Sequence, residues 1–211
     1  MNFSNFKISI KLGIIFLLLV VMTAVAGGFA LSQMAKINGN TEELADNWLP
    51  SVQYLGEMQS FLNESRSAQV LHVLAVVPED KKPEADRIAD NKRKLEEAGA
   101  KYAALLSSPE EERLWAQYSQ QFKAFYDSNT KLLALSDVGP AELDATSVYV
   151  RGESRAVFRA IQGTLTEMTR LNVEGAGVAR TTAAATYSSA QMAVASVVMI
   201  TVVLAIVLGV W

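Results

Sequence analysis

The sequence contains no cysteine and a single histidine, His72. The absence of cysteine excludes disulfide bonds, thiolate metal sites and cysteine nucleophiles. A single histidine likewise excludes histidine clusters for zinc and a relay of several histidines. The sequence also lacks a phosphate-binding glycine loop, a nucleophile elbow and a pair of carboxylates at a telling spacing. We therefore expect no enzyme activity, no cofactor and no metal site.

Basic stripes and strand patterns are also missing. The 22 acidic residues outnumber the 19 basic ones, and the basic residues do not gather along one face. Nucleic-acid binding needs clustered lysine and arginine, so we expect no nucleic-acid partner. Before the C-terminal segment, few β-branched residues cluster and no long stretch alternates between polar and apolar residues. The predicted fold class is therefore all-α.

Two long apolar runs are the main feature that the sequence does contain. Residues 12–31 and 193–211 carry no charged side chain. Each run has about the 20 residues that a helix needs to cross a membrane. We therefore predict transmembrane helices at 12–31 and 190–211. Residues 32–189 would then form one domain on the side of the membrane opposite both termini.

The residues around the first run predict its orientation. Lys7 and Lys11 precede this run without any acidic residue, and the charges beyond it are mostly acidic. This asymmetry favours a cytoplasmic N-terminus at 1–11 and a periplasmic domain. A cleaved signal peptide is the alternative, because residues 24–26 (AVA) resemble a cleavage site. The apolar run continues past that site to Leu31, which favours an uncleaved anchor.

Spacing and helix-capping residues predict four helices between the two runs. Pro83 suits the first position of the second helix, because it has no N–H to leave unbonded. Ser108 and Glu111 form a capping-box pattern at the start of the third helix. The expected helices extend from the first apolar run to about 77, from about 84 to 106, from about 108 to 136, and without a break from between 141 and 147 into the second apolar run.

The inward-facing residues follow three- and four-residue steps. On the first helix the expected stripe includes Leu62, Val70 and Leu74. The fourth helix carries a seven-residue repeat of Phe158, Ile161, Leu165, Met168, Asn172, Gly175 and Ala179.

Because the connections are short, neighbouring helices must be antiparallel, which predicts an up-down-up-down four-helix bundle. The first and fourth helices are longer than the other two and would continue into the two transmembrane helices. Small residues on the fourth helix would let a second subunit approach closely, so we expect a homodimer. These residues are Asn172, Gly175, Ala179, Thr182 and Thr186.

The whole chain resembles the sensory half of bacterial methyl-accepting chemotaxis receptors, of the four-helix-bundle class. The order of spans and helices carries this resemblance, together with four local matches. These are Phe6-Lys7-Ile8, Asn47-Trp48-Leu49-Pro50, Asn63-Glu64-Ser65-Arg66, and Leu171-Asn172 with Tyr187. In that family, a HAMP segment and a cytoplasmic signalling hairpin follow the second span. Neither is found in this sequence, so we expect an excised sensory module.

The resemblance implies a multi-pass receptor of the bacterial inner membrane with a periplasmic sensory domain. It would bind a small ligand and signal by displacement of the fourth helix and the second transmembrane helix. The same module also occurs on histidine kinases and cyclic-dinucleotide enzymes, so the attached output stays open. A membrane-tethered adaptor that binds a protein partner is a further alternative.

Arginines on the expected inward stripes indicate a ligand site. Arg66 lies four residues after Leu62, and stepping back along the repeat from Phe158 leads through Ser154 to Arg151. Counting 1.5 Å per residue places these arginines within roughly 5 Å of the same level. A buried charge is costly unless it is paired, and the guanidinium group fits a carboxylate.

This pattern predicts a small anionic ligand, such as malate, citrate or an amino acid. Pairing with internal acids, Glu64 or Glu153, is the alternative. In the related receptors, arginines and a polar cluster early in the fourth helix bind the ligand. The candidate ligand-binding residues here are Arg66, Arg151, Tyr149, Thr146, Arg155, Asn63 and Tyr126. We expect His72 to be a packing or surface residue, and Trp48 to be a packing plug near the base of the bundle.

Overall fold

The computed structural model describes residues 8–210, and every regular element within them is helical. This confirms the predicted all-α fold. The helices divide into two compact units. One unit spans residues 45–176, and the other combines residues up to 44 with those from 177 onward.

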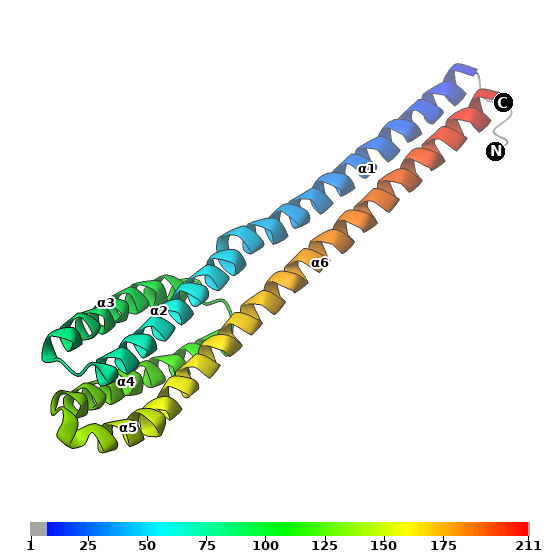
Figure 1. The fold of residues 1–211 in the computed structure, drawn as a ribbon. Coiled ribbons are helices and arrows are strands. Elements are labelled where there is room, and N and C mark those ends of the chain that lie inside the picture. The colour runs from blue at the N-terminus through cyan, green and yellow to red at the C-terminus, as the bar shows by residue number, and fades with distance from the viewer. Residues whose placement is uncertain (1–7, 211) are drawn as a thin grey trace. The chain divides into compact units, whose positions relative to one another are not determined.

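The first unit is a four-helix bundle. It contains α2 (Leu49–Leu74), α3 (Pro78–Ala103), α4 (Pro109–Asp137), α5 (Leu143–Arg151) and the beginning of α6 (Glu153–Val210). Figure 1 shows these helices side by side, joined by short connections. Its core includes Ile161, Leu165 and Met168 from the predicted repeat of the fourth helix, together with Ile88, Leu95, Tyr102, Leu114 and Phe125 from α3 and α4.

The start of α3 differs from the prediction. The helix begins at Pro78, after an extended Val77, and Pro83 lies inside it. Glu79 and Asp80 occupy the first turn, where negative charge interacts favourably with the helix dipole. Either proline suits a first helical position, and the acidic residues after Pro78 favour the earlier start.

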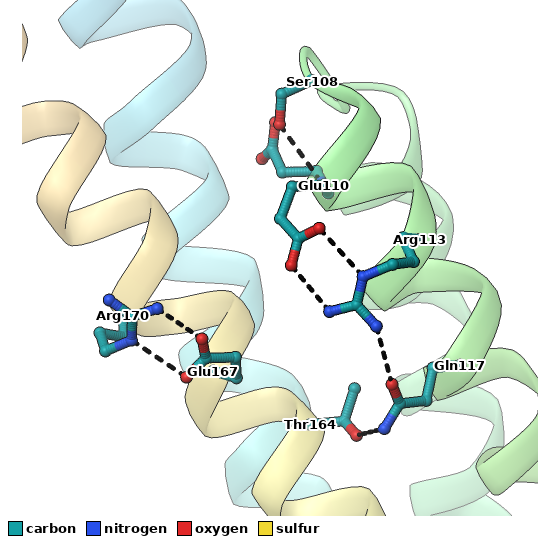
Figure 2. A network of polar contacts seen from close by, with 8 residues as sticks. Ser108, Glu110, Arg113, Gln117, Thr164, Glu167 and Arg170 are labelled. Atoms are coloured by element: carbon teal, nitrogen blue, oxygen red, sulfur yellow. Dashed lines mark hydrogen bonds and ion pairs between the residues drawn. The ribbon is translucent and has the colours of Figure 1, made fainter.

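The predicted capping box at the start of α4 is confirmed. The Oγ atom of Ser108 accepts a hydrogen bond from the Glu111 backbone N–H at 3.2 Å. The buried Glu111 carboxylate reaches back and accepts a hydrogen bond from the backbone N–H of Ser107 at 3.0 Å. Figure 2 shows this helix start beside α6, where Gln117 donates a hydrogen bond to the Thr164 hydroxyl at 3.0 Å.

A close contact at one end of the bundle involves Trp48 and Gly175. Trp48 ends a π-helical turn (Leu44–Trp48) just before α2, and Pro50 lies at the start of that helix. A β-carbon at Gly175 would overlap the Trp48 indole ring, because the farthest of the three nearest ring atoms would lie only 2.8 Å away. Trp48 therefore acts as the predicted packing plug.

Nearby, the Asn172 amide donates a hydrogen bond to the Tyr102 hydroxyl at 3.2 Å. Asn172 and Gly175 thus have packing roles within the bundle. Their small size therefore has a reason within one chain, and the homodimer stays a prediction.

The fourth helix of the bundle is broken at Gly152, contrary to the predicted continuous rod. Gly152 has φ −96° and ψ −101°, and it separates α5 from α6. The other end of α5 follows a turn at Gly139, whose φ of +85° favours glycine. Beyond Gly152, α6 is one helix from Glu153 to Val210.

The second unit consists of α1 (Ile8–Glu43) and the later part of α6. Its large apolar side chains are mostly exposed, including Leu12, Phe16 and Ile200. Within the described residues, two helices are long and apolar enough to cross a membrane. Exposed apolar side chains of this kind are stable in lipid, which agrees with the two predicted spans.

Candidate ligand-binding site

Polar residues occupy the inward face of α2 where an apolar stripe was expected. The buried positions continue from Leu62 through Ser65 and Gln69 to His72. Val70 is 38% exposed and Leu74 is 68% exposed, so the prediction that these two face inward is wrong. The buried face includes polar residues, so choosing only apolar residues led to the wrong face of the helix.

Arg66 lies beside this polar face and reaches the break between α5 and α6. Its Nη1 atom donates hydrogen bonds to Gln69 Oε1 at 2.9 Å and to Ser154 Oγ at 2.8 Å. Its Nη2 atom donates to the Val150 carbonyl at 2.7 Å. In a continuous helix, that carbonyl would accept the N–H of residue 154. The break at Gly152 therefore leaves an acceptor that Arg66 uses.

The partners of Arg66 are all neutral. Within residues 8–210, no carboxylate lies within ion-pair distance of its guanidinium group. Both acids proposed as internal partners bond elsewhere. Glu64 accepts a hydrogen bond from Ser60 at 3.4 Å, and Glu153 pairs with Lys131 at 3.2 Å. Burial lowers the pKa of Arg66, and the positive charge of Arg155 lowers it further. The half-buried cation therefore has no counter-ion among the described residues.

The predicted inward position of Arg151 is wrong. Its side chain is exposed and its Nε atom donates to the Ser147 carbonyl of the same helix at 3.1 Å. The prediction extended the repeat of α6 backward through Gly152, and the break there changes the helical phase. Arg155 is also exposed, yet it is close enough to Arg66 for their charges to interact.

Tyr149 and Thr146, the other two candidates on α5, are buried. The Tyr149 hydroxyl is 3.0 Å from Ser128 Oγ, and the Lys131 ammonium lies 4.4 Å from the centre of its ring. Thr146 donates a hydrogen bond to the Glu142 carbonyl at 2.8 Å. Thr146 also lines a cavity formed with residues other than Arg66.

Asn63 and Tyr126 bond to residues other than Arg66. Asn63 is exposed and accepts a hydrogen bond from Gln162 at 3.4 Å. The Tyr126 hydroxyl lies 3.5 Å from Ser65 Oγ, and burial raises the pKa of Tyr126 to about 12. Either of these two hydroxyl groups can be the donor, so the pair is satisfied without Arg66.

Two acceptors of Arg66 were not predicted from the sequence, the Gln69 side chain and the Val150 carbonyl. Gln69 accepts from Arg66, and its Nε2 atom donates to Asn129 Oδ1 at 3.1 Å. The side-chain amides of Gln69 and Asn129 are both buried. Gln69 lies seven residues after Leu62, so its heptad position could have revealed it. The Val150 carbonyl had no such signal in the sequence, because it can accept from Arg66 only where the helix breaks.

His72, nearer the end of α2, is also buried. Its Nδ1 atom lies 3.0 Å from Ser136 Oγ, and its Nε2 atom lies 3.5 Å from an Asp137 carboxylate oxygen. Burial lowers the pKa of His72, although the charge of Asp137 partly opposes this. The packing interpretation of His72 agrees with this position.

Comparison with known proteins agrees with this architecture. Residues 5–187 match a family model described as a four helix bundle sensory module for signal transduction. The chain belongs to this family. It is also 22% identical over 177 residues to the Bacillus subtilis (strain 168) protein named "Putative sensory transducer protein YvaQ". That alignment covers 82% of this chain and 30% of the relative.

Membership of the family places the chain among the sensory modules of chemotaxis receptors, which are membrane-anchored and act in signal transduction. Such a module is not itself catalytic. The two apolar helices agree with membrane anchoring. The chain spans less than a third of the length of its curated relative.

Proposed function

We propose that this sensory module binds a small organic acid or amino acid through Arg66. The supporting observation is a half-buried guanidinium group whose hydrogen-bond partners are all neutral. Arginine offers two parallel N–H donors to one carboxylate, and a charged acceptor forms stronger hydrogen bonds than a neutral one. A ligand carboxylate would replace the Val150 carbonyl or the Ser154 hydroxyl as the acceptor.

The same exchange provides a route for the signal. Arg66 holds α2 against both sides of the Gly152 break, through Val150 before it and Ser154 after it. A ligand that takes over these hydrogen bonds changes the relative stability of two packings of α5 and α6. The response is limited by the difference in ligand affinity between the two packings. A displacement of α6 that extends to its C-terminal apolar segment would then carry the signal across the membrane.

Arg155 would add to the attraction of an anion. Its charge already interacts with that of Arg66, and a bound carboxylate would relieve this repulsion. A dicarboxylate or tricarboxylate, such as malate or citrate, fits two neighbouring cations better than a monocarboxylate. We further propose that the module works as a homodimer with its bundle in the periplasm.

A thermal-shift panel of the 211-residue chain in detergent would test the proposal. Malate, citrate, aspartate, serine and uncharged sugars would be compared. A true ligand at 100 times its Kd stabilises the protein by about 2.7 kcal/mol. We expect at least one acid to raise the melting temperature, Arg66→Lys to remove most of that effect, and Arg151→Ala to preserve it. Stabilisation by neutral compounds alone, or by acids equally in the Arg66→Lys variant, would contradict the proposal.

A further inference from the structure

A cavity of about 340 Å³ lies where the α2–α3 and α4–α5 connections meet. Its walls include the apolar side chains of Leu74, Val76 and Leu143, which are 52–84% exposed. Its polar lining comes from Lys81, Ser136 and Thr146. The volume falls at the lower end of the range for small-molecule sites. The cavity therefore has room for a small molecule, which would shield the apolar side chains of its walls from water.

Lys81, in the second turn of α3, brings a positive charge to this cavity. The residue is only 8% exposed. Its ammonium group donates hydrogen bonds to the carbonyl and the hydroxyl of Ser136, both of which are neutral. An ammonium group has three donors, so one is left for a further acceptor. Among residues 8–210, no carboxylate forms an ion pair with Lys81.

The charged groups around Lys81 are engaged elsewhere. Asp137 contacts His72 at 3.5 Å, and Glu84 lies 3.2 Å from Arg87, although the Oε2 atom of Glu84 is buried without a hydrogen bond. Lys81 lies at the last turn of α4, where a cation interacts favourably with the helix dipole. That interaction is smaller than the cost of removing an ammonium group from water. The helix end therefore accounts for only part of the burial of Lys81.

We propose that this cavity is a second binding site, for a small monocarboxylate with a short apolar tail. The carboxylate would accept a hydrogen bond from the remaining Lys81 donor, and the tail would pack against Leu74, Val76 and Leu143. A single cation favours a ligand with a single carboxylate. The other site differs, because Arg66 and Arg155 there form a pair of cations. The two sites are also separated along α2, since Val73 of the cavity wall lies roughly 10 Å beyond Arg66 at 1.5 Å per residue.

Butyrate is a suitable probe, with acetate and 1-butanol as controls for the tail and the charge. Binding to the 211-residue chain in detergent would be followed by isothermal titration calorimetry. We expect saturable butyrate binding and at least about tenfold weaker binding of both controls, since each lacks one half of the interaction. Lys81→Met should weaken butyrate binding by about tenfold or more. Lys82→Met is the matched control, because Lys82 is exposed and pairs with Asp86, and it should have no effect.

Two further variants separate this site from folding defects and from Arg66. Leu143→Trp fills the cavity without changing Lys81, so it should also abolish butyrate binding while the protein stays helical by circular dichroism. Arg66→Lys should leave butyrate binding unchanged, even if it removes the response to other acids. Equal butyrate binding in the wild type and Lys81→Met, or no saturable binding to the folded wild type, would overturn this inference. Loss of butyrate binding in Arg66→Lys alone would assign butyrate to the Arg66 site and also overturn it.

Discussion

Replacing Gly175 by alanine should destabilise the bundle, although alanine is the better helix former. The added β-carbon would overlap three carbons of the Trp48 indole ring, the farthest of them at 2.8 Å. The ring cannot give way cheaply, because it is rigid and held next to the π-helical turn before Pro50. Overpacking of this kind costs about 1–3 kcal/mol. Helix propensity offsets up to about 1 kcal/mol of that cost.

Gly163 provides the matched control on the same helix. A β-carbon there has no neighbour within 4 Å, so Gly163→Ala should stabilise the protein by up to about 1 kcal/mol. Thermal unfolding followed by circular dichroism would report both changes, at roughly 2–4 °C for each kcal/mol. The two substitutions should therefore shift the melting temperature in opposite directions.

A double variant would show whether Trp48 is the cause. Trp48→Leu removes the indole ring, so Gly175→Ala should cost less in that background than in the wild type. The coupling between the two substitutions should be at least about 0.5 kcal/mol, as found for residues in contact. If Gly175→Ala and Gly163→Ala have the same effect, the packing of Trp48 on Gly175 is refuted.

Three further substitutions test other parts of the structure. Arg66→Ala should lower ligand-free stability by about 1–3 kcal/mol, because it leaves buried acceptors unpaired. The control Arg151→Ala, at an exposed residue, should change it by no more than about 0.5 kcal/mol. Equal effects of the two substitutions in urea unfolding would contradict the hydrogen bonds assigned to Arg66. The pKa of His72 is lowered in the folded state, so the unfolded chain binds the proton more readily and stability should fall as the pH drops below about 6.5. His72 is the only histidine, so His72→Gln should remove this dependence between pH 5 and 7, and an unchanged slope would refute it. Ser108→Ala should cost about 1 kcal/mol through loss of the α4 cap, while Ser119→Ala on the exposed face should cost much less.

The helices and most of the core could be predicted from the sequence because their signals are local. The capping box at Ser108 and the repeat from Phe158 to Met168 depend on neighbouring residues in one helix. Pro78 and Pro83 both suit a first helical position, and the later start was predicted because the acidic residues after Pro78, which favour the earlier one, were given no weight.

The candidate site was predicted only in part because it depends on non-local features. Arg66 was identified from its position on α2, yet its acceptors arise from a helix break 84 and 88 residues later in the chain. The break at Gly152 also turned Arg151 to the surface. Glycine occurs inside helices often enough that Gly152 alone did not predict a break. Gln69 and Ser65 were missed because the stripe of the first helix was defined by its apolar residues alone, Leu62, Val70 and Leu74.

A structure of the bundle with its acid ligand would test the central claim most directly. The acid would be the compound that gives the largest thermal shift in the panel. We predict that both oxygens of one ligand carboxylate accept hydrogen bonds from Arg66, at about 2.7–2.9 Å. Arg66 would then have released Val150 or Ser154. A ligand bound elsewhere, with the hydrogen bonds from Arg66 to Val150 and Ser154 intact, would contradict the claim.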